Sequence, residues 1–173
     1  MLALLFYSLL TLYLIIIFLF NKPMFSKACE YAIRAVLYIA VKSIDGSKLS
    51  IKEIAKEIDS PEPFTAKILQ TLSREGIISS IKGPNGGFYL ATKSKPVPLA
   101  AIVKAIDGED VLHSCALGLK ECSDTFPCPI HEDIKSYKTR LRQVMNERTV
   151  QQLSQELKDG KTFLRNYKVK ISR

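Results

Sequence analysis

Two stretches of apolar residues at helical spacing follow residue 23. Between residues 27 and 43, small and aliphatic side chains recur on one side of a helix without a proline or glycine: Ala28, Ala32, Ala35, Val36, Ile39 and Ala40. A shorter repeat over residues 51–58 follows Ser50 and Glu53, which have the spacing of an N-terminal capping box. The pattern predicts a core helix and then a short helix that begins after Ser50.

A third helix is predicted from about residue 63 to residue 75. The preceding turn, residues 59–63, holds two prolines, which can open a helix but cannot continue one. Phe64, Ile68 and Leu72 form the predicted buried side. The side chains predicted to stay outside are Thr65, Lys67, Gln70, Thr71 and Arg74.

A glycine-rich turn then separates two segments of strand character. Gly76 ends the third helix, residues 77–81 are rich in β-branched side chains, and residues 88–91 supply a partner strand. Residues 83–87, Gly-Pro-Asn-Gly-Gly, suit a chain reversal. Helices, tight turn and glycine-tipped hairpin together predict a winged helix-turn-helix domain over residues 24–95. In this fold the third helix enters the major groove of DNA, and the wing lies along the backbone or minor groove.

The rest of the chain is predicted to be helical around a loop. Residues 96–108 contain a small amphipathic helix, and from residue 130 the side chains of Ile134, Tyr137, Leu141 and Val144 keep a spacing that suits packing against a partner helix. The repeat breaks near residues 146–149, where Thr149 and Gln152 form a second capping box. We expect a linking helix and cysteine loop over 96–129, a dimerisation helix and short following helix over 130–159, and a basic tail over 160–173.

The N-terminal residues 1–20 carry no charged side chain and are long enough to span a bilayer. They lack the positively charged start and the small-residue cleavage site of a signal peptide. Met24 begins a segment with the features of a complete protein. We therefore interpret residues 1–23 as the product of a start codon assigned too early, which predicts a cytoplasmic protein, and keep a membrane anchor as the alternative.

The composition is basic: 25 Lys and Arg face 17 Asp and Glu, a net charge of +8. Such an excess favours an anionic partner, although a solvated basic surface would suffice if no DNA-binding motif accompanied it. The length, 173 residues, allows one compact domain with an accessory helix or two. The sequence holds no nucleophile–base pair or phosphate-cradling loop, so neither an enzyme nor a small-molecule substrate is expected.

Three cysteines, Cys115, Cys122 and Cys128, lie within one predicted loop. Thiolates are soft ligands for zinc, copper(I) and iron–sulfur clusters, and a loop lets three of them converge. The spacers of six and five residues are wider than in structural zinc knuckles, which favours a larger cluster. Disulfides fit a cytosolic protein poorly and would leave one thiol of the loop unpaired. Cys29, on the first helix, is predicted to be a core residue.

A set of three cysteines needs a fourth donor. His131, three residues after Cys128, could offer an imidazole nitrogen. Glu30, on the first helix, could supply a carboxylate, including from the other subunit of a dimer. The residues leave both alternatives open.

From residue 24 to about residue 157 the chain resembles the Rrf2 family of bacterial winged-helix regulators. The resemblance rests on Phe-Ser-Lys at 25–27 before Tyr-Ala-Ile-Arg-Ala at 31–35, on Leu-Ser-Arg-Glu-Gly-Ile-Ile at 72–78, and on Lys-Gly-Pro-Asn-Gly-Gly-Phe at 82–88, followed by three cysteines. It implies a homodimer that crosses its long helices, with a cluster near the dimer interface.

The resemblance also implies ligands. Cys115, Cys122 and Cys128 correspond to the cluster cysteines, although the first spacer is one residue longer than in many members. His131 occupies the position of a histidine ligand to a two-iron cluster in IscR-like members, and Glu30 that of an acidic ligand in NsrR-like members. A two-iron and a four-iron cluster both stay open.

The third helix and the wing would read DNA. Among the exposed side chains of the helix, Lys67, Gln70 and Arg74 have the reach for base edges, and we expect Lys67 and Gln70 to use it. Phosphate contacts are expected from Arg34, Lys82 and Lys93. Thr65, Thr71 and Asn85, the last at the wing tip, complete the predicted DNA-binding set.

The sequence thus predicts a mainly α fold with a small β-wing and a long C-terminal dimerisation helix. The predicted function is a homodimeric regulator that binds double-stranded DNA and senses cluster status, redox state or nitric oxide. The alternatives are a zinc-stabilised or cluster-free winged-helix regulator, and a membrane-anchored interaction protein if residues 1–20 belong to the protein.

Overall fold

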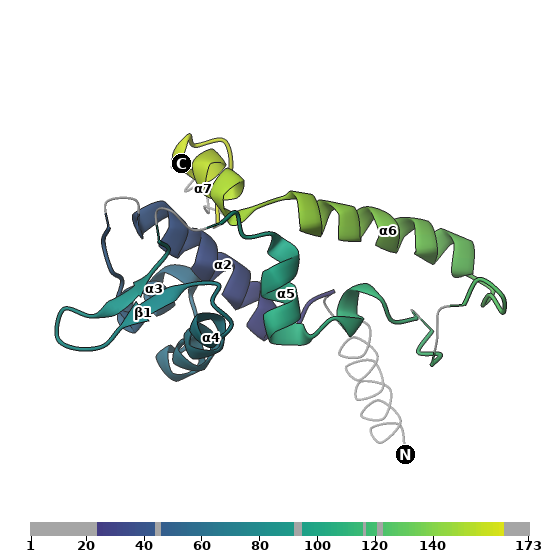
Figure 1. The fold of residues 1–173 in the computed structure, drawn as a ribbon, viewed down its shortest axis with the longest axis horizontal. Coiled ribbons are helices and arrows are strands. Elements are labelled where there is room, and N and C mark those ends of the chain that lie inside the picture. The colour runs from purple at the N-terminus through teal and green to yellow at the C-terminus, as the bar shows by residue number, and fades with distance from the viewer. Residues whose placement is uncertain (1–23, 44–45, 92–94, 116, 121–122, 165–173) are drawn as a thin grey trace, which may run out of the picture.

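The computed structural model describes residues 24–43, 46–91, 95–115, 117–120 and 123–164, and these form helices and one small sheet (Figure 1). The helices are α2 (Lys27–Lys42), α3 (Ile51–Ile58), α4 (Glu62–Arg74), α5 (Leu99–Asp107), α6 (His131–Glu147) and α7 (Val150–Lys158), with a 3₁₀ turn η2 (Asp110–Leu112). The strands are β1 (Ser79–Ile81) and β2 (Gly87–Tyr89). The predicted fold class is confirmed.

The predicted N-terminal apolar segment, residues 1–23, lies outside the described residues, as do Lys93, Cys122 and the tail from residue 165. Within the described part of the chain, each helix is too short or too polar to cross a bilayer.

Residues just before α3 and α4 determine where these two helices start, as the sequence predicts. Before α3, the Ser50 hydroxyl accepts from the Glu53 backbone N–H at 3.2 Å, and the Glu53 carboxylate accepts from the Ser50 backbone N–H at 2.8 Å. These two bonds satisfy donors that a helix start would otherwise leave unpaired. Before α4, Pro61 is the N-cap residue, and its fixed φ suits a helix entry.

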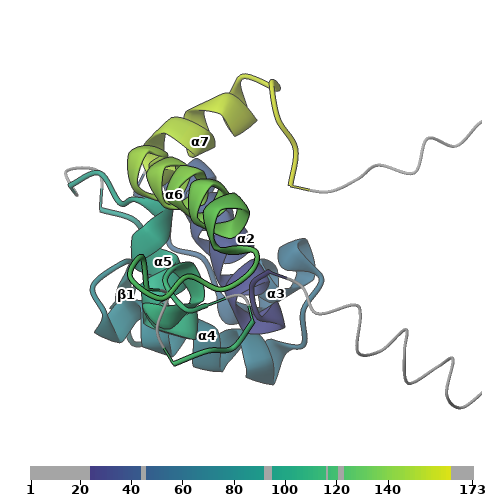
Figure 2. The ribbon, with the colours of Figure 1, turned by 90° about the vertical axis from the view of Figure 1, so that its right-hand side faces the viewer.

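Helix α2 forms the centre of the core. Its residues Ala32, Ala35, Val36 and Ile39 are fully buried, and the helix packs against α3, α4, α5 and α7. Figures 1 and 2 show α2 between α7 on one side and the α3–α4 pair on the other. The small side chains of α2 allow several helices to approach it closely.

The wing is shorter than predicted. Strands β1 and β2 pair in antiparallel fashion with Ser80 opposite Phe88, whereas Ile77 and Ile78 belong to the core and precede the strand. The backbone N–H of Ile77 donates to the Leu72 carbonyl at 3.0 Å and so closes the end of α4. The two isoleucines have strand propensity, but burial beside α4 determines their conformation.

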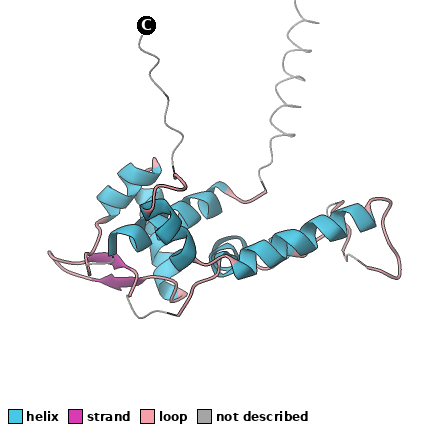
Figure 3. Cartoon of the chain, turned by 90° about the horizontal axis from the view of Figure 1, so that it is seen from above, coloured by secondary structure: helices cyan, strands magenta, loops and turns pink. Residues whose placement is uncertain are grey.

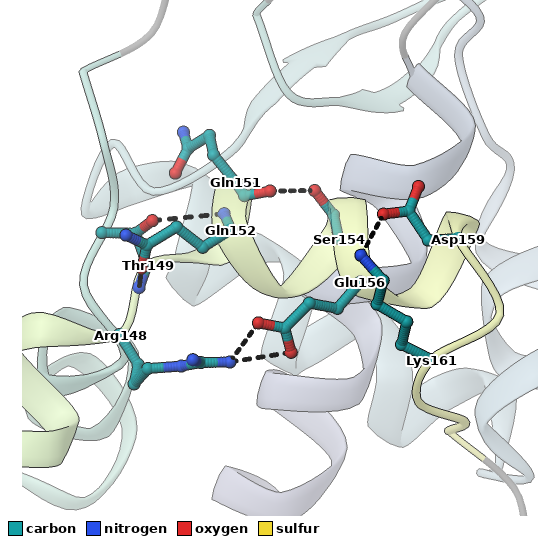
Figure 4. Close-up of polar contacts among 8 residues, drawn as sticks. All are labelled: Arg148, Thr149, Gln151, Gln152, Ser154, Glu156, Asp159 and Lys161. Carbon is teal, nitrogen blue, oxygen red and sulfur yellow. Dashed lines mark hydrogen bonds and ion pairs between the residues drawn. The ribbon is translucent and has the colours of Figure 1, made fainter.

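Helices α6 and α7 meet at the predicted break. Arg148 has an extended backbone, and the Thr149–Gln152 capping box starts α7 with both of its bonds present. The Arg148 guanidinium contacts both carboxylate oxygens of Glu156 at 2.7 and 2.8 Å (Figure 4). The Arg148 carbonyl also accepts from the Leu99 N–H at 3.0 Å, which ties this junction to the start of α5.

Helix α6 extends away from the body of the molecule (Figures 1 and 3). Its side chains Leu141 and Met145 pack against the small core group of Cys29, Val103 and Leu112. Tyr137 and Val144, on a neighbouring side of the same helix, are 53% and 36% exposed. The predicted apolar stripe is therefore only partly covered within one chain.

Candidate nucleic-acid interface and cysteine loop

Helix α4 lies in the part of the molecule away from the far end of α6 (Figure 1), and it carries several long polar side chains. Lys67, Gln70 and Arg74 are exposed, and Thr71 is half-buried. Each of the three exposed residues can donate hydrogen bonds, to base edges or to phosphates.

Two expectations about α4 are wrong. Thr65 is fully buried, and Phe64, predicted to be buried, is 37% exposed. The Thr65 hydroxyl donates to the hydroxyl oxygen of Ser60 at 3.0 Å or the carbonyl of Pro61 at 3.1 Å. Thr65 therefore cannot reach DNA and leaves the predicted contact set. A buried threonine is acceptable here because the adjacent turn satisfies its polar atom.

A hollow of about 580 Å³ separates α4 from the wing. Its wall includes Gln70 and Arg74 from α4 and Lys82, Gly83 and Gly86 from the hairpin. Cationic and amide donors thus surround a space in which the glycines leave the backbone accessible. Such a lining suits phosphate oxygens, which accept from Arg, Lys and backbone N–H groups.

Close packing fixes the position of the wing. Phe88 exchanges two backbone hydrogen bonds with Leu49, each 2.9 Å long, and this bridge joins the wing to the segment before α3. A Cβ atom on Gly87, whose φ is +154°, would lie 2.7 Å from the Leu49 carbonyl oxygen. Glycine is thus required at this position. Lys82 and Asn85 are both exposed on the turn that follows β1.

Arg34 lies on α2 rather than on α4 or the wing. Its guanidinium carbon is 4.7 Å from the centroid of the Tyr31 ring, a cation–π distance. The stacking restricts the side chain and leaves it half-buried.

Two of the predicted cysteine ligands are among the described residues: Cys115 is buried and Cys128 is half-buried. The pKa of Cys115 is lowered, first by the backbone N–H of Leu117, then by that of Leu119, with smaller effects from Cys128 and the Lys138 ammonium. Hydrogen bonds to sulfur favour the thiolate, which is the form that binds metals.

His131 begins α6, three residues after Cys128. Its backbone N–H donates to the Cys128 carbonyl at 2.9 Å, and its side chain is buried. Its Nε2 lies 2.7 Å from Asp124 Oδ1, and the same oxygen accepts from Lys135 Nζ at 2.6 Å. Lys135, followed by His131, lowers the pKa of Asp124 through hydrogen bonds. The carboxylate thus joins the loop to the first turns of α6.

Glu30, the other candidate for the fourth ligand, pairs with Lys27 at 2.6 Å. Within the described residues, no three His, Cys, Asp or Glu side chains meet at one point. Cys122, the remaining predicted cysteine ligand, is outside those residues.

Cys29 is a core residue, as predicted. It is fully buried, and burial together with the charge of Asp107 raises its pKa to about 12. Asp107 also accepts from the backbone N–H of Ser26 at 2.8 Å. A thiol this far from ionisation is a poor ligand.

Sequence reasoning did not identify Asp124, Asp107 or the exposure of Phe64. Asp107 and Ser26 are 81 positions apart, and no local pattern links them. Asp124 lies seven residues before His131, a spacing with no helical meaning inside a loop. The nearby proline at 127 was the only signal of a turn that could bring them together.

The model of the family described as "Rrf2: Iron-dependent Transcriptional regulator" matches residues 25–156. The chain belongs to the Rrf2 family. It is 30% identical over 131 residues to an Aquifex aeolicus protein named as an HTH-type transcriptional regulator, a match that covers 75% of this chain and 90% of that protein. The family and this relative are both described as regulators of transcription, and this chain is a transcriptional regulator rather than an enzyme.

Two further similar proteins carry the names of individual regulators, NsrR and IscR. The transcriptional regulator NsrR of Oceanobacillus iheyensis is 25% identical over 128 residues, which cover 73% of this chain and 86% of that protein. The solved structure of T. potens IscR aligns with a TM-score of 0.61 at 18% identity, over 83% of this chain and 94% of that one. The second likeness shows a shared fold.

Proposed function

We propose that this Rrf2 regulator binds double-stranded DNA as a homodimer and that its cysteine loop holds an iron–sulfur cluster whose state controls the binding. The observation that carries the proposal is the buried His131 at the start of α6, whose backbone N–H donates to the Cys128 carbonyl at 2.9 Å. Cys128 also contributes to the lowered pKa of Cys115, thirteen positions earlier. Two soft ligands thus belong to the loop that leads into the helix with the exposed apolar residues.

The DNA-binding part of the proposal rests on α4 and the hairpin. Lys67 and Gln70 are the proposed base-reading residues, because they are exposed near the middle of a helix that fits the major groove. Arg74 and Lys82, on the wall of the hollow between α4 and the wing, are the proposed phosphate contacts. Arg34, Thr71, Asn85 and Lys93 remain weaker members of the proposed set.

The dimer part rests on α6. Tyr137 and Val144 leave an apolar strip exposed on a helix that extends away from the body. A second copy of the same helix would cover this strip in a two-fold symmetric contact. Two winged domains would then face two half-sites of one operator.

The cluster part rests on the donor set. Cys115, Cys122 and Cys128 would hold the group, with His131 or Glu30 as the fourth ligand. The lowered pKa of Cys115 fits a metal-bound thiolate. When bound, a cluster supplies a centre that oxidants or nitric oxide can modify. In this proposal, Asp124 orients His131 and the loop backbone keeps the thiols of Cys115 and Cys128 adjacent.

A zinc-stabilised regulator is the second candidate, since thiolates and a buried imidazole are also zinc ligands. The two candidates differ in colour, because iron–sulfur clusters absorb visible light and zinc does not. They also differ in what the bound group does: a structural zinc ion would stabilise the fold, but its loss would not serve as a signal that controls DNA binding.

The test uses the full chain, purified without oxygen in mild detergent because residues 1–20 are apolar. Visible absorption, iron and sulfide are measured for the wild type, for Cys122→Ala and for Cys29→Ala as a matched control outside the loop. The proposal expects a coloured protein, loss of colour in Cys122→Ala and retention in Cys29→Ala. A colourless wild type that contains zinc, or that takes up no cluster on reconstitution, would contradict it.

The regulatory step is tested by fluorescence anisotropy with duplexes selected by the protein from a random pool. The cluster-loaded protein and the same protein after iron chelation should differ in affinity for the selected duplex. Equal affinities would remove sensing and leave a DNA-binding regulator.

A further inference from the structure

Phe64 is an exposed aromatic residue at the start of the helix that we propose to read DNA. It is the third residue of α4, and its side chain is 37% exposed although its spacing predicts burial. Along the same helix, Lys67 is exposed and Thr71 half-buried. An apolar ring thus borders a polar surface.

The ring of Phe64 is held from the inner side by α2. Its centroid lies 5.8 Å from that of Tyr31, with the two planes at 80°, an edge-to-face arrangement. The Arg34 guanidinium stacks on the same Tyr31 ring at 4.7 Å, and Lys27 Nζ lies 5.8 Å from its centroid. The aromatic pair is therefore fixed, and two cations flank it.

This combination matches one chemical feature of DNA. The first residues of a recognition helix meet base edges in the major groove. The apolar group on those edges is the C5-methyl group of thymine, which aromatic and small apolar side chains contact. Phosphates border the groove, and the Arg34 guanidinium beside Tyr31 suits them.

We propose that Phe64 contacts a thymine methyl group and makes the protein select an A·T pair at that position of each half-site. This inference rests on the proposed binding of DNA through α4, and it adds a specificity-determining residue to Lys67 and Gln70. Tyr31 and Arg34 position the ring from behind.

The test replaces thymine by uracil, which removes only the methyl group. The full-length wild-type protein first selects its preferred duplex from a random pool. Each thymine of that duplex is then replaced singly by uracil, and affinities are measured by fluorescence anisotropy for the wild type, Phe64→Ala and Phe64→Leu. Lys67→Ala is the matched control, one helical turn away on the same surface.

For the wild type, the affinity should fall about three- to five-fold at one thymine of each half-site, the size expected when one methyl group leaves an apolar contact. Phe64→Ala should show no loss at that thymine, and Phe64→Leu an intermediate one. Lys67→Ala should bind more weakly to every duplex yet keep the same dependence on the methyl group. Thermal denaturation checks that each variant is folded, and Phe64→Leu serves if the alanine variant is not.

The outcomes separate this inference from the function on which it rests. If the wild type selects no duplex, the proposed DNA binding fails and this inference fails with it. If the wild type selects a duplex but uracil is neutral throughout, only the contact to thymine is overturned. The same holds if Phe64→Ala keeps the methyl dependence of the wild type, because the ring then only supports the helix.

Discussion

The hydroxyl of Thr65 lies 3.0 Å from the hydroxyl of Ser60 and joins the first turn of α4 to the turn before it. Thr65 is fully buried, and its backbone N–H also donates to the Pro61 carbonyl at 2.9 Å. The residue therefore ties the first turn of α4 to Ser60 and Pro61. Its contribution is to the stability and placement of the helix, without direct contact to DNA.

Replacement of Thr65 by valine should destabilise the protein by about 1 kcal/mol, the usual net value of one hydrogen bond. Valine keeps the shape of the side chain and replaces its hydroxyl by a methyl group, which cannot donate to Ser60 or Pro61. Lys67→Ala should show the opposite behaviour, with unchanged stability and weaker DNA binding, because its side chain is exposed. Urea denaturation and anisotropy on a selected duplex measure the two effects. A Thr65→Val protein of wild-type stability would contradict the structural role.

The fold could be predicted where neighbouring residues in the sequence determine it. Both capping boxes, the break before α7 and the glycine turn of the wing depend on residues within a few positions of each other. The assignment of sides on α4 failed, because Phe64 and Thr65 lie at the border of the buried face and tertiary neighbours decide between them. Ser60 satisfies the threonine, and Tyr31 holds the phenylalanine at the surface.

The candidate site could be predicted in its residue types but only partly in its geometry. The cysteine spacing indicates a common centre, which stays a prediction, since Cys122 lies outside the described residues. The contact of Asp124 with His131 depends on the path of an irregular loop, which no periodicity describes. The bond between Ser26 and Asp107 depends on packing of the two ends of the domain.

The two capping boxes should respond differently to pH. Hydrogen bonds from Ser50 lower the pKa of Glu53, so this box stabilises the fold above the ordinary glutamate value of 4.5 and loses that contribution as the pH falls through the lowered pKa. Ser50→Ala should cost about 1 kcal/mol at pH 7, and less at pH values below the lowered pKa. Thr149→Ala should cost a similar amount at both, because its partner Gln152 does not titrate. Denaturant titrations at pH 7 and at a pH below the lowered pKa of Glu53 measure the stability loss of each variant. If the two losses changed equally with pH, the prediction would be refuted.

Gly87→Ala should disrupt the wing. The new Cβ would meet the Leu49 carbonyl oxygen at 2.7 Å, and backbone atoms cannot move aside without breaking the Leu49–Phe88 bridge. We expect a loss of about 1–3 kcal/mol in stability, together with weaker DNA binding. Asn85→Ala, at the exposed tip, is the control for an alanine in the same turn and should keep wild-type stability. Thermal denaturation measures both variants, and equal melting temperatures for Gly87→Ala and Asn85→Ala would contradict the requirement for glycine at position 87.

Tyr137→Glu should convert the proposed dimer into monomers. The substitution puts a charge into the exposed apolar strip of α6, and a second copy would have to bury it. Thr139→Glu places the same charge on the opposite side of the helix and should leave the dimer intact. Light scattering after size-exclusion chromatography gives the masses. Dimers of Tyr137→Glu, or a monomeric wild type, would show that this strip is not the interface.

Cys29 should resist alkylation in the folded protein. Its pKa is raised to about 12, first by burial and then by the Asp107 carboxylate, so almost none of it is thiolate at pH 8. Cys128 is only half-buried and should react with iodoacetamide in metal-free protein long before Cys29 does. Mass spectrometry of peptides from native and guanidinium-unfolded samples locates the label, and Cys29 should be modified only in the unfolded sample. Asp107→Asn should leave Cys29 slow to react, since burial is the larger cause of its raised pKa; fast labelling of Cys29 in this variant would mean that the carboxylate protects it instead.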